Sequence, residues 1–197
     1  MEKLRADVSA AARKVLGYAG QCPQQPALVA IDGRCGAGKT TLAAAIQQAA
    51  GAAVVHMDDF FLQAGQRTPA RLAEPGGNVD RERVLEEVLR PLREQRPVVY
   101  RPYDAHRDAM LGPVCLEPAP VTVIEGSYSC HPALWGYYSL RVFVDVPPGE
   151  QLRRIRARNG PGGLEAFRAK WIPLEEAYFR AFPPEGRCDL YIELAPA

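Results

Sequence analysis

The residues best suited to chemistry form one glycine-rich segment, Gly33-Arg34-Cys35-Gly36-Ala37-Gly38-Lys39-Thr40, which matches the pattern GxxxxGK followed by Ser or Thr. Its glycines allow backbone N–H groups to turn inward around phosphate oxygens, and the start of the following helix favours negative charge. Lys39 is expected to reach the terminal phosphates, and Thr40 to ligate Mg²⁺. The sequence therefore predicts a site for ATP and Mg²⁺. The predicted nucleotide-binding residues are Gly33, Arg34, Cys35, Gly36, Ala37, Gly38, Lys39, Thr40 and Thr41.

Two adjacent carboxylates, Asp58 and Asp59, follow an apolar run that is predicted to be a strand. Ligands of parallel sheets bind outside the carboxyl ends of the strands, so Asp58 is expected to face the γ-phosphate. A carboxylate there can accept the proton of an attacking hydroxyl or help to hold Mg²⁺. Because successive residues of an extended chain point to opposite sides, at most one of the two is expected to face the phosphate. The alternative is that both aspartates cap the following segment.

Glu125 directly follows the apolar run Val121-Thr122-Val123-Ile124. A strand that ends in an acid has the form in which a carboxylate supports Mg²⁺ directly or through water. Any strand can end in a charged residue, so the pattern alone also fits a residue without such a role. Glu125 is therefore a candidate metal-binding residue beside Thr40 and Asp58.

Short apolar runs alternate with helical patterns, and these elements must position the candidate residues. The order is typical of a parallel sheet with helices on both faces. Pro91 and Pro173 each fall inside a predicted helix and are expected to kink or restart it, because proline removes a backbone donor. The fold class is therefore α/β, a P-loop NTPase fold with a mainly parallel, five-stranded sheet. The predicted strands are Ala27–Asp32, Ala52–Met57, Val121–Glu125, Leu140–Val146 and Asp189–Glu193, and the predicted helices are Lys39–Ala50, Asp80–Gln95, Gly149–Arg158 and Leu164–Ala181.

Four further segments complete the predicted organisation of a single domain, residues 1–197. Residues 1–20 are expected to form an amphipathic helix, and residues 97–118 a hairpin inserted before the third strand. The stretch 63–78 lacks periodicity and is rich in Gly and Pro, as in a loop that can fold over a ligand. The aromatic segment Trp171–Phe179 is interpreted as core packing rather than as a wall of the cleft.

Composition excludes several classes of function. The 24 Lys and Arg residues nearly balance the 23 Asp and Glu residues, so no global field favours nucleic acid as a partner. The apolar runs are far shorter than the roughly 18 residues of a membrane span, and the amino-terminal segment lacks the apolar stretch of a signal peptide. The five cysteines form no CxxC pair and are expected to be reduced thiols. These features favour a cytoplasmic protein, and they leave a homo-oligomer open.

Together, GRCGAGKTT, MDDFF, NVD, PYD and IEG resemble the uridine kinase and phosphoribulokinase family of P-loop kinases, which includes nicotinamide riboside kinases. The resemblance covers about residues 27–194. It implies that Asp58, followed by one residue and the aromatic Phe60, is the catalytic base, and that Glu125 supports the metal. It also implies that residues 150–165 lead into a lid over ATP. From this segment an arginine, Arg154 first, is expected to neutralise charge on the transferring phosphate.

The same resemblance implies where an acceptor binds. Asp80 matches a ribose-binding aspartate, although aspartate is also a preferred N-cap, and both roles can hold at once. Residues 101–107 are similar to the hairpin with which these kinases embrace the base and sugar, so Tyr103, His106 and Arg107 are candidate substrate-binding residues. In the family the histidine lies further beyond the Tyr-Asp pair. Taken alone, His106 and Arg107 also fit solvent-exposed turn residues.

The predicted activity is that of an ATP-dependent kinase for a small molecule, with the 5′-hydroxyl of a nucleoside as the acceptor. Nicotinamide riboside, pantothenate or a sugar phosphate are alternative acceptors. A sugar phosphate would require cations near the acceptor. A nucleotide switch or ATPase without a small acceptor is an alternative of another class. The candidate cations for a sugar phosphate are Arg67, Arg71, Arg101 and Arg107.

Overall fold

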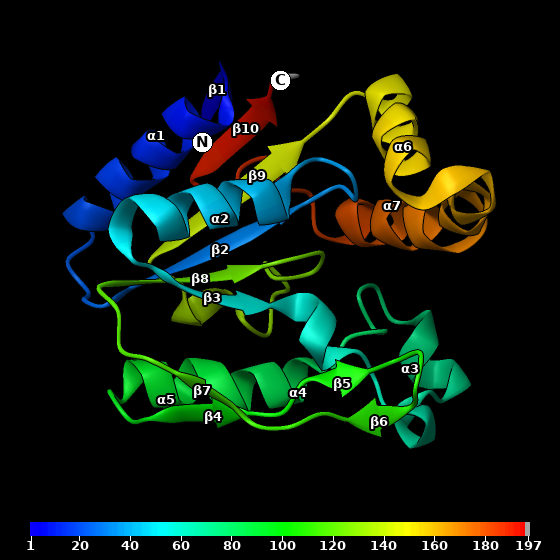
Figure 1. Ribbon diagram of the computed structural model, residues 1–197, viewed down its shortest axis with the longest axis horizontal. Helices are drawn as coiled ribbons and strands as arrows, with labels where there is room; N and C mark the ends of the chain where they lie inside the picture. Colours follow the sequence, from blue (N-terminus) through cyan, green and yellow to red (C-terminus); the bar gives the residue numbers. More distant parts are fainter. Residues whose placement is uncertain (196–197) are drawn as a thin grey trace.

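The structure is a computed structural model that describes residues 1–195. It has a parallel sheet of six strands in the order β1-β10-β9-β2-β8-β3, which confirms the predicted α/β class (Figure 1). All five predicted strands are present. They are β2 (Ala27–Gly33), β3 (Ala53–His56), β8 (Val121–Glu125), β9 (Leu140–Asp145) and β10 (Leu190–Leu194).

The sixth strand corrects the predicted amino-terminal helix. Residues 1–20 are not one helix, because β1 (Glu2–Ala6) pairs in parallel with β10 before α1 (Val8–Gln21) begins. Side chains along β1 alternate between half-buried and exposed, as in an edge strand. The carboxylate of Asp7 accepts a hydrogen bond from the Ala10 N–H at 2.8 Å, so this residue starts the helix seven positions into the chain.

Two apolar cores lie on opposite faces of the sheet. On one face α1 and α2 (Lys39–Ala50) pack against the strands and bury residues such as Val15 and Ile46 (Figure 1). The other face packs against the helical segment that follows Asp80 and against the carboxyl-terminal helices, with Val88 and Tyr178 in its core. Helices therefore cover both faces, and the carboxyl ends of the strands stay at one edge of the sheet, where α6 (Pro148–Ala166) and α7 (Ile172–Ala181) lie (Figure 1).

The two helical segments that contain Pro91 and Pro173 each widen just before the proline. The first runs from α4 (Arg81–Arg83) through a π-helical turn, η3 (Val84–Leu89), into α5 (Arg90–Arg93), and the Arg90 N–H bonds to Leu85 O. The second has a π-helical turn η5 (Phe167–Trp171) before α7 (Ile172–Ala181), and the Ile172 N–H bonds to Phe167 O. Each wide turn ends two residues before its proline, at Leu89 before Pro91 and at Trp171 before Pro173. The predicted disturbance of both helices is thus confirmed.

The segment predicted as a lid belongs to α6 (Pro148–Ala166). This helix changes direction at Gly160, whose φ of 71° and ψ of 179° are not helical. Pro161 follows the change of direction. The kink and the π-helical turn η5 leave a short helical stretch between two irregular points of the backbone.

The inserted hairpin is also confirmed. Strand β4 (Val98–Tyr100) pairs antiparallel with β7 (Val114–Leu116), and β5 (Tyr103–Asp104) pairs with β6 (Ala109–Met110). The predicted loop 63–78 contains two short helical pieces, η2 (Ala64–Gln66) and α3 (Pro69–Ala73). Two further 3₁₀ turns are η1 (Met57–Phe60) and η4 (Trp135–Tyr137). Among residues 1–195, helices of the length and apolar character needed to cross a membrane are absent.

Candidate active site

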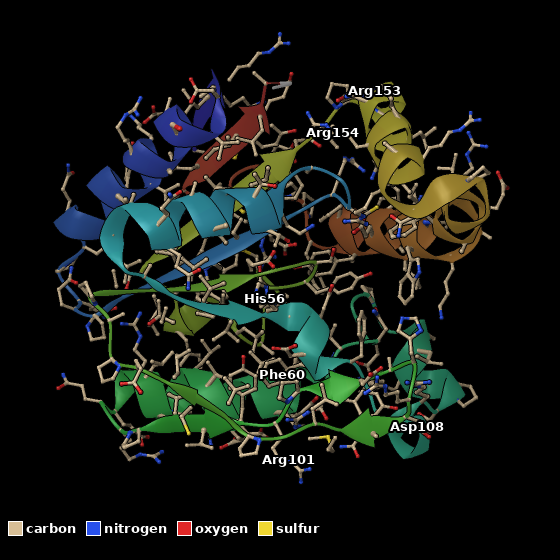
Figure 2. The ribbon with its side chains drawn as sticks, viewed as in Figure 1. His56, Phe60, Arg101, Asp108, Arg153 and Arg154 are labelled. Carbon is tan, nitrogen blue, oxygen red and sulfur yellow. The ribbon has the colours of Figure 1, made fainter. Side chains whose placement is uncertain are left out.

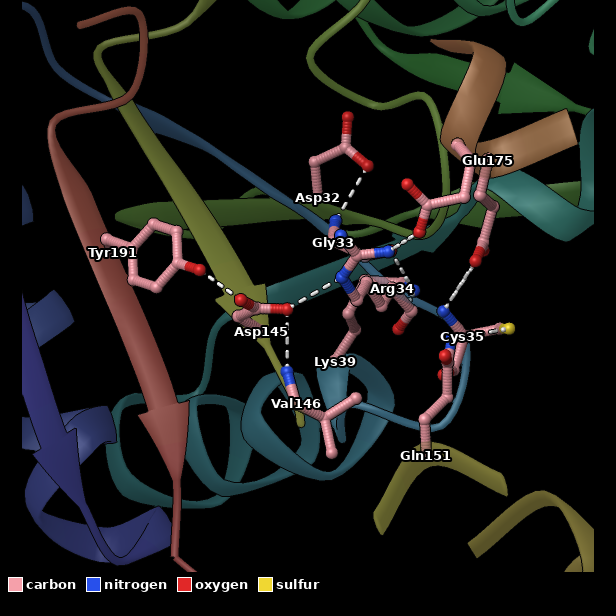
Figure 3. A network of polar contacts seen from close by, with 11 residues as sticks. Asp32, Gly33, Arg34, Cys35, Lys39, Asp145, Val146, Gln151, Glu175 and Tyr191 are labelled. Carbon is pink, nitrogen blue, oxygen red and sulfur yellow. Dashed lines mark hydrogen bonds and ion pairs between the residues drawn. The ribbon is translucent and has the colours of Figure 1, made fainter. Parts of the chain in front are cut away.

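The glycine-rich loop connects the buried strand β2 to the first turn of α2 (Figure 3). Gly33 has a φ of 139°, and a Cβ atom there would lie 1.9 Å from Val144 O, so only glycine fits this approach to β9. Gly38 is the N-cap of α2 with a φ of 101°. The backbone therefore makes the turn that phosphate-binding loops need, at the positive end of a helix.

Lys39 folds back over this loop. Its Nζ donates to Gly33 O at 2.7 Å and to Arg34 O at 3.0 Å, and it lies 3.5 Å from the Ser127 hydroxyl. The side chain is 8% exposed, so its charge is held close to the loop rather than in bulk solvent. This is the position from which a lysine reaches the terminal phosphates of a nucleotide.

Thr40 and Glu125 meet at the edge of the sheet. The Thr40 hydroxyl donates to Glu125 Oε1 at 3.1 Å, and His56 Nδ1 lies 2.6 Å from the same oxygen. Glu125 is buried, and its hydrogen bond with His56 raises the pKa of that imidazole, against the opposing effect of burial. Hydroxyl and carboxylate oxygens are the ligands that Mg²⁺ prefers. The donor set present at this corner therefore fits the predicted metal.

His56 was not among the predicted site residues. It lies at the end of β3 (Figure 2), and the pairing of β3 with β8 places it directly opposite Glu125. A histidine at the end of a strand that also carries the candidate base could have been noticed, but the register that joins it to Glu125 is not visible in the sequence.

The two adjacent aspartates diverge as expected, although the chain around them is a 3₁₀ turn rather than extended. Asp58 lines the cleft, whereas Asp59 accepts a hydrogen bond from the Tyr100 hydroxyl at 3.1 Å. Asp58 is exposed to solvent within the cleft, although neighbouring protein groups displace part of the water around its carboxyl. This partial desolvation raises the pKa of its carboxyl, and the charge of Lys39 opposes the increase. A carboxylate with a raised pKa is a stronger proton acceptor.

A cleft of about 860 Å³ joins the loop, the metal corner and Asp58. Its floor comes from the loop and from the residues after β8, and its walls come from α6, η5 and α7. Phe61 and Trp171 face each other in its wall with ring centroids 5.8 Å apart. Sequence reasoning placed Trp171 in the core, and the structure corrects this. The same segment does bury Tyr178 and Phe179, so the interpretation as core packing holds for its second half.

Arg154 lies in the first half of α6 and lines the cleft beside the loop (Figure 2). Its Nε donates to Glu150 Oε1 at 2.7 Å, and its Nη1 approaches Gly36 O and Ala37 O at 3.4 and 3.3 Å. Arg153 and Arg158 also line the cleft. The arginine-rich helix therefore places cationic groups beside the phosphate-binding loop.

Arg34 points elsewhere. Its Nε donates to Asp145 Oδ1 at 2.9 Å (Figure 3), and its other end pairs with Glu176. The guanidinium thus joins the loop to β9 and α7, and the side chain does not line the cleft. Any role in nucleotide binding would come from its backbone.

Of the four residues predicted to bind an acceptor, His106 alone lines the cleft. Asp80 is buried at the N-cap of α4, where its carboxylate accepts from the Arg83 N–H at 3.1 Å and from Gln66 Nε2 at 2.6 Å. The Tyr103 hydroxyl is bonded to Asp108 and Arg67, and exposed Arg107 pairs with Asp104. Substrate contacts by these residues stay predictions.

The buried carboxylate of Asp32 lies next to the loop and holds neighbouring segments of the site by hydrogen bonds. It accepts from the N–H groups of Gly33, Tyr128 and Cys130 at 2.7, 3.0 and 2.9 Å, and from the Tyr178 hydroxyl at 3.0 Å. Burial raises the pKa of Asp32, and these hydrogen bonds oppose the increase. Asp32 thereby fixes the segment that follows Glu125.

No model of a known protein family matches the sequence, and no curated protein matches it. Solved structures do. A protein from Silicibacter sp. TM1040, provisionally named a fructose transport system kinase, is 23% identical with a TM-score of 0.69, over 93% of this chain and 98% of its own. A protein from Bacillus stearothermophilus, provisionally named a uridine kinase, is 19% identical with a TM-score of 0.71, over 94% and 96%. The chain therefore shares the fold of these proteins, which is consistent with the resemblance found in the sequence.

Proposed function

We propose that the protein is an ATP-dependent kinase that phosphorylates the primary hydroxyl of a small, neutral acceptor, and that this hydroxyl is the 5′-hydroxyl of a nucleoside. The observation that carries the proposal is that one cleft brings together Lys39, Thr40, Glu125 and Asp58. Two structures of the same fold bear the names of small-molecule kinases, which supports the same class of reaction.

Asp58 is the general base of this proposal. It lines the cleft, its carboxyl has a raised pKa, and Lys39 lies near enough to influence its charge. The carboxylate accepts the proton of the acceptor hydroxyl as that oxygen attacks phosphorus. The attacking and leaving oxygens must lie in line, so most of the rate enhancement comes from positioning and from stabilisation of charge.

Charge on the transferred group is stabilised by the loop and the lid. Bound ATP supplies the γ-phosphoryl group, and bound Mg²⁺ neutralises its oxygens. Thr40 and Glu125 would hold the metal, with Asp58 as a further oxygen donor. The Lys39 ammonium, the loop N–H groups and the cationic side of α6 face the same cleft and attract the phosphates.

The surroundings of the acceptor favour a neutral molecule over a sugar phosphate. Arg67 and Arg71 are held by backbone oxygens of Leu62, Gly77 and Val79, and Arg71 also pairs with Glu82. None of the four candidate cations for an acceptor phosphate (Arg67, Arg71, Arg101 and Arg107) lines the cleft. The arginines that do line it belong to α6, beside the loop.

The aromatic pair in the wall of the cleft favours an acceptor with a flat ring. Phe61 and Trp171 offer apolar faces in the same cleft as Asp58, and His106 adds a polar group from the hairpin. A nucleoside combines such a ring with a primary hydroxyl. Nicotinamide riboside, pantothenate and a free sugar share the hydroxyl and are the alternatives to be tested.

The test is ADP release from MgATP, measured across a panel of nucleosides, nicotinamide riboside, pantothenate, fructose and sugar phosphates. Strong stimulation by one neutral acceptor, lost in Asp58→Asn, is the expected result. Hydrolysis of ATP that none of these acceptors accelerates would favour a nucleotide switch or ATPase and would contradict the proposal.

A further inference from the structure

A buried carboxylate that the proposed reaction does not use contacts the phosphate-binding loop. Both oxygens of Glu175 lie 3.0 Å from the backbone nitrogen of Cys35 (Figure 3). The Ser127 hydroxyl donates to Glu175 Oε1 at 2.7 Å. Glu175 is 3% exposed and comes from α7, 140 residues beyond Cys35. An ionised group buried in this way needs strong partners, and here one of them is a loop suited to anions.

The carboxylate lies toward the end of the loop where the terminal phosphates are expected. Lys39 Nζ is 3.5 Å from the Ser127 hydroxyl, which is itself bonded to Glu175. A lysine of this motif reaches the β- and γ-phosphates. Burial and the nearby charge of Glu175 also raise the pKa of the Cys35 thiol to about 12, so this cysteine adds no second anion.

Residues of α6 and α7 bind the backbone of Cys35 from two sides. Glu175 of α7 accepts from its N–H, and Gln151 Nε2 of α6 donates to its carbonyl at 3.1 Å. The polypeptide between these two residues contains the kink at Gly160 and the π-helical turn Phe167–Trp171. Single π-helical turns inside α-helices occur frequently at functional sites.

We propose that Glu175 competes with the terminal phosphate of a nucleotide for the loop and that it thereby sets the affinity for ATP. The inference rests on the proposed function, because it requires ATP as the ligand of the loop. Binding of ATP brings the γ-phosphate, with its negative charge, to the end of the loop that Glu175 occupies. The carboxylate must then give way or be repelled, so it weakens binding of the triphosphate more than that of the diphosphate.

The test is calorimetric binding of a non-hydrolysable ATP analogue, ADP and AMP to the wild type and to Glu175→Gln. Glutamine keeps the size of the side chain and can still accept from Cys35 and donate to Ser127, but it lacks the charge. Glu165→Gln is the matched control, because it removes one charge from the exposed side of the lid, where Glu165 pairs with Arg168.

Glu175→Gln is expected to bind the ATP analogue about tenfold more tightly than the wild type, a gain of about 1.4 kcal/mol. The gain should be smaller for ADP and absent for AMP, and Glu165→Gln should show none. Equal or weaker binding of the ATP analogue by folded Glu175→Gln would overturn the inference. Nucleotide binding by none of the proteins would instead contradict the proposed function.

Should Glu175→Gln fail to fold, Glu175→Asp keeps the test available. Aspartate is one methylene shorter, so it withdraws the carboxylate from Cys35 without changing the net charge. It is expected to tighten binding of the ATP analogue by a smaller factor. Unchanged or weaker binding in that variant would count against the inference.

Discussion

Asp58→Asn separates the chemical step from nucleotide binding. Asp58 lines the cleft but is not a hydrogen-bond partner of the loop, and the amide has nearly the same shape. A positioned general base contributes about 10²- to 10⁴-fold in rate. Its loss is therefore expected to raise the barrier by about 2.7 to 5.4 kcal/mol, while the affinity for ATP stays within a few-fold of that of the wild type.

The pH dependence and the stability of this variant follow from the raised pKa of Asp58. In the wild type, kcat/KM should fall with decreasing pH below a midpoint that lies above the ordinary pKa of an aspartate, and Asp58→Asn should lack this limb. The raised pKa means that the folded state binds this proton more tightly than the unfolded state. Ionisation of Asp58 therefore costs stability as pH rises through this range, so Asn should raise the Tm at neutral pH.

Asp59→Asn is the matched control for this prediction. Asp59 is the adjacent residue, but it bonds to the Tyr100 hydroxyl instead of lining the cleft. The rate of the Asp59→Asn variant should stay within a few-fold of that of the wild type in the same acceptor-dependent ADP-release assay. Equal losses in the two variants, or full activity of Asp58→Asn, would refute the role given to Asp58.

Three further predictions concern the loop and the wall of the cleft. Lys39→Ala should abolish most acceptor phosphorylation, since the ammonium is held at the mouth of the loop, and a normal rate in the same assay would contradict this. Gly33→Ala should lower the Tm and remove ATP binding, because the added Cβ would lie 1.9 Å from Val144 O. We expect chemical denaturation to show a free energy of unfolding that is lower by about 2–4 kcal/mol. Wild-type stability would instead show that β9 can move aside. Trp171→Ala should raise the acceptor KM about 2- to 10-fold and leave the ATP KM unchanged, whereas the reverse pattern would place the aromatic pair in the nucleotide site.

Much of the fold followed from local patterns in the sequence. Strand β2 and the start of α2 are marked by an apolar run, a glycine-rich turn and an alanine-rich helix, and each of these signals is contiguous in the chain. Pro91 and Pro173 marked the two places where a helix widens, because the effect of a missing backbone N–H is local. Strand β1 was not predicted, because three of its five residues are charged. These residues form a strand only through their pairing with β10 at the edge of the sheet.

The candidate site was predictable where motifs carry it and obscure where distant residues meet. Lys39, Thr40 and Asp58 follow from motif positions, and the structure brings them to one cleft. The contact of His56 with Glu125 depends on strand register, and that of Glu175 with Cys35 joins residues 140 positions apart. No periodicity in a single sequence encodes such pairs.

The acceptor side shows a second reason for the limits of sequence reasoning. A tyrosine in a hairpin can face a ligand or its own neighbours, and here Tyr103 is buried against Asp108 and Arg67. Asp80 fits a sugar clamp and a helix cap equally well by residue type, and its carboxylate caps α4 while it also bonds to Gln66. The competing hydrogen-bond partners decide such cases, and they come from the tertiary structure.

The most direct test of the proposed kinase is ³¹P NMR of the protein with MgATP and the acceptor that most stimulates ADP release. We predict that ATP is converted to ADP while a new phosphomonoester signal appears, split by the two protons of a CH₂ group, and that Asp58→Asn forms it far more slowly. Release of inorganic phosphate without a phosphomonoester would contradict phosphoryl transfer to a primary hydroxyl.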